Sequence, residues 1–74
     1  MNTLDQFAEG ENLRVEKIVC DEKICRRLGE LGIYCGAKIC VVKNDKFGPV
    51  VLKIFDSKIA LGRVEAKKIY AIKN

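Results

Sequence analysis

Four cysteines have the spacing that most resembles a reactive site in this chain of 74 residues. Cys20 and Cys25 form one Cys-x4-Cys pair, and Cys35 and Cys40 form a second. Four thiolates would suit a zinc ion, but structural zinc usually uses tighter Cys-x2-Cys knuckles. Cys25 and Cys40 also fall within a predicted helix and a predicted strand, where a free cysteine behaves as a small hydrophobic residue. We therefore expect no metal site and no cofactor.

The same four thiols are expected to stay reduced. The first residues contain no basic segment followed by an apolar run, so the sequence predicts no signal peptide. No apolar run approaches the ~18 residues that a membrane span needs. These features predict a cytoplasmic protein, and disulfides are rare in that compartment.

The residue types needed for catalysis are largely missing. The chain has no histidine, which excludes histidine-based triads and histidine-ligated metal sites. Gly29 and Gly32 do not form a phosphate-binding loop, because no Gly-Lys-Ser/Thr follows them. Acidic residues lie close together at 9 and 11 and at 21 and 22, but these positions fit a turn and a helix cap, where carboxylates are routine. The sequence therefore predicts that the protein is not an enzyme.

The net charge of +4 is unevenly distributed along the chain. Residues 1–32 carry a net charge of −2, and residues 33–74 carry +6. A basic half can face nucleic acid, an acidic protein or anionic lipid. The lysines are scattered rather than clustered, which favours the simpler interpretation that they protect exposed strands and edges.

The sequence predicts one amphipathic helix at residues 21–31. Asp21 is a suitable N-cap, because its carboxylate can accept hydrogen bonds from free first-turn N–H groups. Ile24, Leu28 and Leu31 recur at helical spacing and form one apolar stripe. Gly32 is placed to end the helix in a left-handed conformation. Within the helix Gly29 costs about 1 kcal/mol relative to alanine, and we expect another backbone to approach it closely.

Strand-like segments lie on both sides of this helix. We expect strands at 13–19, with a bulge near Lys17, and at 36–43, 49–55, 57–62 and 69–72. A turn at 3–8 should pack Leu4 and Phe7 onto the core, residues 44–49 should form a loop, and residues 56–57 a tight reversal. Residues 63–68 should form a single 3₁₀ turn.

Five short strands separated by turns are typical of a small barrel. The predicted fold is therefore mainly β: a small SH3-like five-stranded β-barrel with one α-helix inserted between the first two strands. Closing the sheet would remove its exposed edges. The length suits a single domain over residues 1–74. The residues predicted to be buried are Ile24, Leu28, Leu31, Ile39, Val41, Leu52, Ile54, Ile59, Leu61 and Ile69.

Four segments taken in order resemble the FeoA family of small cytoplasmic ferrous-iron transport proteins. They are Arg-Leu-Gly-Glu-Leu-Gly-Ile at 27–33, Gly-Ala-Lys-Ile at 36–39, Gly-Pro-Val at 48–50 and Ile-Ala-Leu-Gly-Arg at 59–63. The resemblance implies an SH3-like barrel and a non-enzymatic partner of FeoB, a membrane ferrous-iron permease with a GTP-binding domain. It also implies a location at the inner face of the membrane through that partner. The cysteines lie outside the family pattern.

A binding role directs attention to charged and aromatic side chains near the helix and turns. Arginine and exposed aromatic residues are favoured at interfaces. Arg63 has an alternative role, in which it braces the barrel end through backbone carbonyls. The candidate partner-binding residues are Arg26, Arg27, Glu30, Leu31, Tyr34, Phe47 and Arg63.

Two other interaction modules remain as alternatives. The basic second half would suit a small nucleic-acid-binding barrel, because phosphate contacts need lysine and arginine. The aromatic residues show no stacking platform along one strand pair, which argues against nucleic acid. The same fold also occurs as an accessory domain of iron-dependent repressors, so a similar interaction module is the other alternative.

Overall fold

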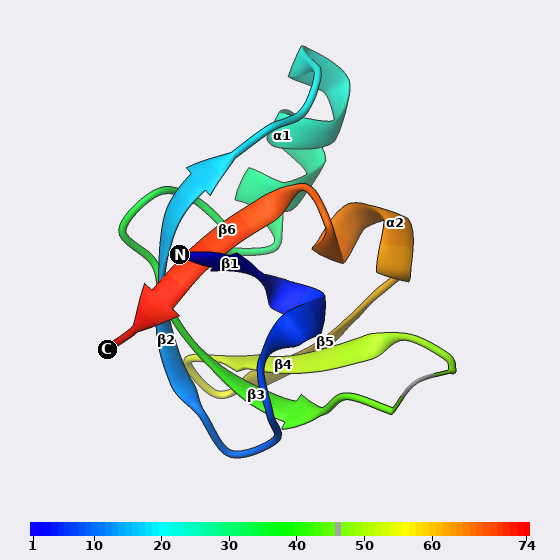
Figure 1. Cartoon of the computed structure of the whole chain (residues 1–74). Coiled ribbons are helices and arrows are strands. Elements are labelled where there is room, and N and C mark those ends of the chain that lie inside the picture. Colours follow the sequence, from blue (N-terminus) through cyan, green and yellow to red (C-terminus); the bar gives the residue numbers. More distant parts are fainter. Residues whose placement is uncertain (46) are drawn as a thin grey trace.

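One curved antiparallel sheet organises the molecule. Both helices connect strands and lie in the upper half of Figure 1. The computed structural model describes residues 1–45 and 47–74. Its elements are β1 (Asn2–Thr3), the 3₁₀ turn η1 (Leu4–Gln6), β2 (Asn12–Ile18), α1 (Glu22–Glu30), β3 (Lys38–Lys43), β4 (Val50–Ile54), β5 (Ser57–Leu61), α2 (Arg63–Ala66) and β6 (Ile69–Lys73).

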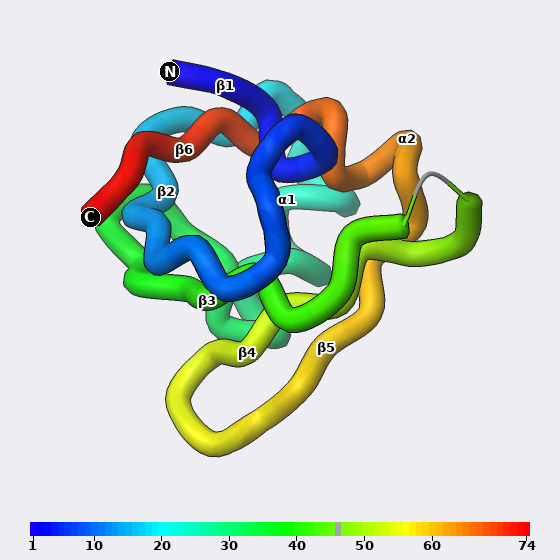
Figure 2. Tube along the Cα trace, turned by 60° about the horizontal axis from the view of Figure 1, so that its bottom comes forward, coloured from blue at the N-terminus to red at the C-terminus, as the bar shows by residue number. Residues whose placement is uncertain are grey.

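The six strands follow the order β1-β6-β2-β3-β4-β5, and all neighbours are antiparallel. The sheet coils around the core, as the tube in Figure 2 shows. Among the described residues the hydrogen-bonded sheet does not close, because β1 and β5 are its two end strands. The predicted mainly β, SH3-like fold is confirmed, with a short extra strand at the beginning and without full closure.

Two irregularities shape the long strands. The register of β2 against β6 shifts between Val15 and Lys17, which confirms the predicted bulge. A second shift, between Val41 and Lys43, interrupts the pairing of β3 with β4. Such extra residues bend a strand and increase its twist, so both shifts help a short sheet to curl.

The core is apolar, and the described residues include no buried polar or charged side chain within it. Leu4 and Phe7 are buried against it from the first turn, as predicted. Most of the predicted core residues are buried, whereas Ile24 and Ile59 are partly buried and pack against the core. The prediction for Leu31 is wrong, because its side chain is 39% exposed. Leu31 caps the helix after its last turn and therefore leaves the apolar stripe.

Helix α1 begins and ends where the sequence predicts. The Asp21 carboxylate accepts a hydrogen bond from the backbone N–H of Ile24 at 2.9 Å, and Gly32 has a φ of 94°. The expected close approach at Gly29 is wrong: no neighbouring described atom lies within 4 Å of a Cβ placed there. Such a Cβ at Gly32 would lie 3.2 Å from the Ile54 side chain, so the crowded glycine is the one that ends the helix.

The segment after β5 also differs in type from its prediction. It is a four-residue α-helix, α2, rather than a 3₁₀ turn. No helix among the described residues has the length and apolar character needed to cross a membrane.

Candidate functional site

The outer face of α1 carries three of the candidate residues. Leu28 is the one buried residue of this helix, which leaves the charged side chains on the surface. Arg26 pairs with Glu22 at 3.0 Å, one turn earlier in the same helix. Arg27 forms an ion pair with Glu65 of α2, so it also connects the two helices. Arg26 and Glu30 are exposed and are therefore available to a partner.

The Arg63 side chain forms a brace within the molecule, that is, a set of hydrogen bonds that joins α2 to the β3–β4 connection. Its Nε donates to the carbonyl of Gly48 at 3.0 Å, and one terminal nitrogen donates to the side-chain oxygen of Asn44 at 2.8 Å. These bonds hold the β3–β4 connection against the start of α2. The geometry is that of the alternative role in which Arg63 stabilises the barrel end.

Asn44 is the centre of this brace. Its side-chain amide donates to the carbonyls of Asp5 at 3.0 Å and Phe7 at 2.6 Å. Its backbone N–H donates to a carboxylate oxygen of Glu9 at 3.0 Å. One residue thus joins the first turn, the end of β3 and α2, and nothing in the sequence pattern singles it out.

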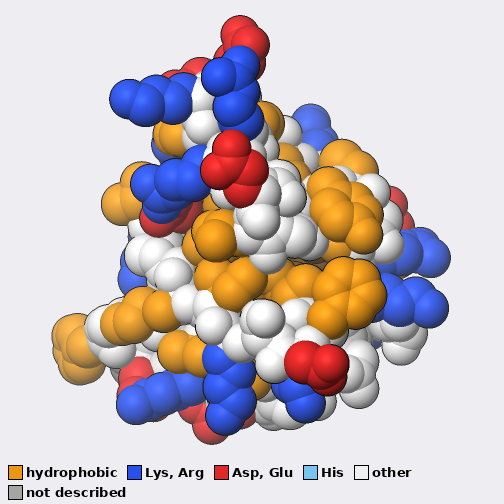
Figure 3. Space-filling view, turned by 180° about the vertical axis from the view of Figure 1, so that it is seen from behind, with side chains coloured by type: hydrophobic (Ala, Val, Ile, Leu, Met, Phe, Trp, Pro, Cys, Tyr) orange, Lys and Arg blue, Asp and Glu red, His pale blue; other side chains and the backbone are white. Residues whose placement is uncertain are grey.

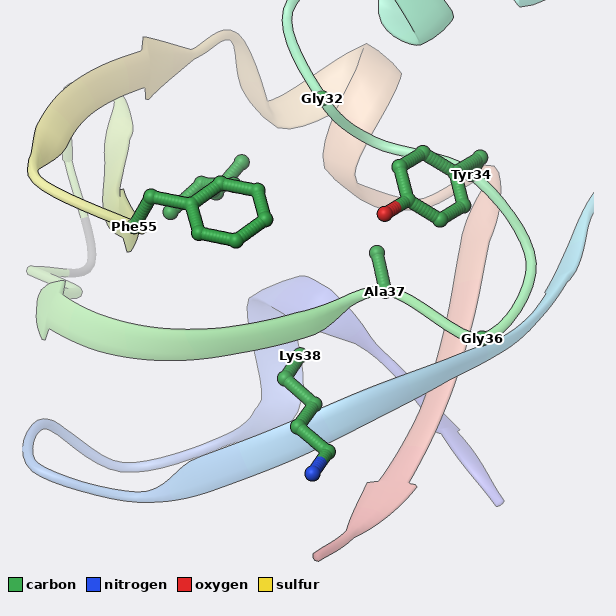
Figure 4. Close-up of a pocket in the computed structure, with 7 residues that line it drawn as sticks. Gly32, Tyr34, Gly36, Ala37, Lys38 and Phe55 are labelled. Atoms are coloured by element: carbon green, nitrogen blue, oxygen red, sulfur yellow. The ribbon is translucent and has the colours of Figure 1, made fainter.

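A groove opens between the turn that follows α1 and the β4–β5 hairpin (Figure 4). Its volume is about 400 Å³. Tyr34 and Phe55 face each other across it, and Ala37 lies between them. Tyr34 is 51% exposed and Phe55 is 82% exposed, whereas Ala37 is buried. The groove therefore has aromatic walls and an aliphatic floor.

Phe55 has an unusual backbone conformation. Its φ is 54°, the only positive value for a non-glycine residue among those described. Such a conformation in a bulky residue costs about 1–3 kcal/mol. It arises because the reversal between β4 and β5 occupies residues 55 and 56, one residue earlier than predicted. Sequence reasoning missed this residue, since a phenylalanine at the end of an apolar run fits a strand.

A second hollow of about 240 Å³ adjoins the groove, and the two share Lys38 and Phe55. Lys53 lines this hollow, and Lys58 lies opposite Lys53 in the register of β4 with β5. Among the described residues no carboxylate lies within ion-pair distance of these lysines. On the face in Figure 3, hydrophobic side chains gather in the middle, and charged side chains of both signs lie around them.

The candidate residues occupy two regions of the molecule. Leu31 and Tyr34 continue from α1 toward the groove. Phe47 is 87% exposed and precedes Gly48, so it lies with the Arg63 brace on the β3–β4 connection. In Figure 1 strands β3 and β4 lie at the bottom of the molecule, whereas α1 lies at the top.

The expectation that all four cysteines are reduced is wrong. Cys20 and Cys25 form a disulfide with a Cα–Cα distance of 5.8 Å. The cap at Asp21 turns the chain sharply, so the residue before the cap meets the first turn of the helix. Cys35 and Cys40 are free. The described residues contain no group of three or more potential metal ligands.

Thiol labelling should distinguish the two free cysteines. Cys35 is exposed and Cys40 is half-buried. A maleimide should therefore modify Cys35 several-fold faster than Cys40, because reaction requires access to the sulfur. Peptide mapping by mass spectrometry measures both rates, and denaturant provides the control in which the difference should vanish. Equal rates in the folded protein would contradict this structure.

A family model described as FeoA domain matches residues 2–73 of the chain. A provisionally named Fe(2+) transport protein A of Methanocaldococcus jannaschii is 41% identical over 61 residues. That match covers 82% of this chain and 73% of the archaeal protein.

Several solved structures share the fold, and two of them illustrate it. A crystal structure of an iron uptake regulatory protein, FeoA, has a TM-score of 0.87 at 22% identity, covering 99% of this chain and 96% of that one. A manganese-dependent transcriptional repressor has a TM-score of 0.89 at 21% identity, covering 99% of this chain and 41% of the repressor. These identities are too low to show more than a common fold.

Proposed function

The chain belongs to the FeoA family, and from this premise we propose that it is a non-enzymatic accessory protein of ferrous-iron transport. The specific role proposed is docking on the cytoplasmic GTP-binding part of a FeoB-type iron permease. The observation that carries this role is the family match over residues 2–73. In this role iron is the cargo of the partner, and the chain acts at the inner face of the membrane through that partner.

The outer face of α1 supports a docking role. The helix packs on the core through buried Leu28 and half-buried Ile24, and most of its other side chains are exposed. Arg26 and Glu30 stand on this open side, and Leu31 and Tyr34 extend it toward the groove. A mixed charged and apolar surface of this kind is typical of interfaces that form and separate.

Charge reversal at Arg26 tests the helix face. Arg26→Glu should weaken binding to the permease about tenfold or more, because like charge at an interface costs far more than in water. Stability should change little, since exposed pairs such as Arg26 with Glu22 contribute about 0.3–0.5 kcal/mol. Sedimentation with vesicles that contain the permease encoded in the same genome measures the binding.

Lys73→Glu is the matched control. Lys73 also pairs with a single glutamate, Glu11, at 4.0 Å, but at the far end of β6; the lysine is exposed and the glutamate is half-buried. The control should bind like the wild type. Arg27 is left unchanged because its ion pair connects α1 with α2. If Arg26→Glu binds as tightly as the control, α1 is not the docking surface; if the wild type never binds, the accessory role fails.

A further inference from the structure

The groove between Tyr34 and Phe55 has features that do not stabilise the folded chain. An aromatic side chain that is 82% exposed contributes little to the core, and Phe55 also occupies a left-handed conformation that glycine would adopt more easily. Lys53 and Lys58 lie directly opposite each other on β4 and β5. Like charges in that arrangement are unfavourable. Phe55 and Lys53 line the hollowed surface, and Lys58 lies opposite Lys53 on the neighbouring strand.

The shape of this surface suits an extended ligand. The larger hollow lies between the two aromatic rings, with Ala37 and Ile54 at its base. It continues past Lys38 and Phe55 into the second hollow, which Lys53 also lines. A ligand that fills both hollows needs one apolar group for the aromatic site and a further stretch of chain alongside the lysines.

The charge of this surface defines the chemistry of that ligand. Lys38, Lys53 and Lys58 are exposed, and none has a carboxylate within ion-pair distance among the described residues. Asp56 shares the tip of the β4–β5 hairpin with Phe55 but forms no ion pair with these three lysines. Carboxylates of a ligand would gain three cations and would relieve the repulsion between the facing lysines.

We propose that this groove docks an extended acidic segment of a protein partner. One apolar side chain of the segment enters between Tyr34 and Phe55, and its carboxylates lie beside Lys38, Lys53 and Lys58. The inference rests on the proposed function only for the identity of the partner, which would be the permease. The groove adjoins the turn after α1, so the segment would extend the same docking surface.

Nucleic acid fits this surface less well than an acidic peptide. Single-stranded nucleic acid is usually held by successive bases stacked on aromatic side chains along a basic channel. Here two aromatic side chains face each other across one hollow, and its floor is aliphatic. That floor suits a leucine or phenylalanine side chain better than the polar edges of a base.

Nuclear magnetic resonance of the full chain tests the occupant. The probe is an eight-residue peptide of glutamate and aspartate with a leucine and a phenylalanine at its centre. Amide shifts should concentrate at Gly36, Ala37 and Ile54, and raising the salt should weaken binding several-fold because it screens the lysines. A peptide with lysine in place of every acidic residue should cause no such shifts.

A pair of variants at exposed apolar side chains tests the groove itself. Phe55→Gly should weaken peptide binding about tenfold, as expected for loss of an aromatic anchor. Its melting temperature should equal or exceed that of the wild type, because glycine suits the left-handed position. Val64→Ala is the control, since this side chain is 71% exposed and lies outside both hollows. The control should bind like the wild type.

Three results would overturn the proposal: no shift at the groove, equal binding by Phe55→Gly and wild type, or displacement of the peptide by a mixed-sequence single-stranded oligonucleotide. Vesicle binding separates this inference from the accessory role. If the wild type binds the acidic peptide but not the permease, the accessory role fails and the groove assignment stands. If it binds the permease but not the peptide, the groove assignment fails alone.

Discussion

Leu28→Ala is expected to lower the free energy of unfolding by about 2–5 kcal/mol. Leu28 is fully buried, and it is the only buried residue of α1. Truncating it removes apolar contacts and leaves a cavity that the backbone cannot easily close, since the helix is held by its cap at Asp21 and by the turn at Gly32. In a domain of this size the melting temperature should fall by roughly 10–30 °C.

Leu31→Ala provides the matched control for that experiment. It makes the same truncation three residues later, at a side chain that is 39% exposed. Chemical denaturation of both variants should show a small loss at Leu31, about 0.5–1 kcal/mol, because exposed changes cost little. Similar losses at the two positions would mean that α1 does not pack through Leu28 as the structure shows.

The second large effect is expected at Asn44. Asn44→Ala removes two hydrogen bonds to backbone carbonyls and the one accepted from Arg63. Each such bond contributes about 0.5–1.5 kcal/mol net, and the partners left without a bond add a further penalty. The total loss should be about 2–4 kcal/mol.

Two measurements check this prediction. Equilibrium unfolding gives the loss of stability, with exposed Asn12→Ala as the control that should change little. Hydrogen exchange should then show faster local opening of the first turn and of the β3–β4 connection, because Asn44 joins them. A loss below that of the control would show that the brace is not needed for stability.

Sequence reasoning succeeded where local chemistry decides the structure. The cap at Asp21 and the left-handed Gly32 set the two ends of α1 through local contacts. The bulge near Lys17 followed from two adjacent apolar residues in an alternating strand. It failed at Leu31, because helical spacing does not reveal where the last turn stops and the chain leaves the helix.

The candidate site was harder to predict, because it depends on residues that meet only after folding. Tyr34 was identified as an exposed aromatic, but its opposite wall, Phe55, comes from a hairpin whose turn lies one residue earlier than expected. Reduced thiols at Cys20 and Cys25 were expected from a cytoplasmic location. The turn at the helix cap instead brings the two residues close enough to form a disulfide. The partners of Arg27 and Arg63 lie far along the sequence, so no spacing rule could predict them.

The hydrogen bonds of Asn44 also bear on the chemical ageing of the protein. Hydrolysis of an asparagine amide yields aspartate, which replaces two N–H donors by a charged oxygen acceptor. At this position the new oxygen would face the carbonyls of Asp5 and Phe7, and the added charge would lie near the Glu9 carboxylate. The new oxygen would repel the two carbonyls, whereas the Arg63 guanidinium would pair with the new carboxylate. Deamidation in a stored sample would therefore loosen the first turn and leave the contact with α2 in place.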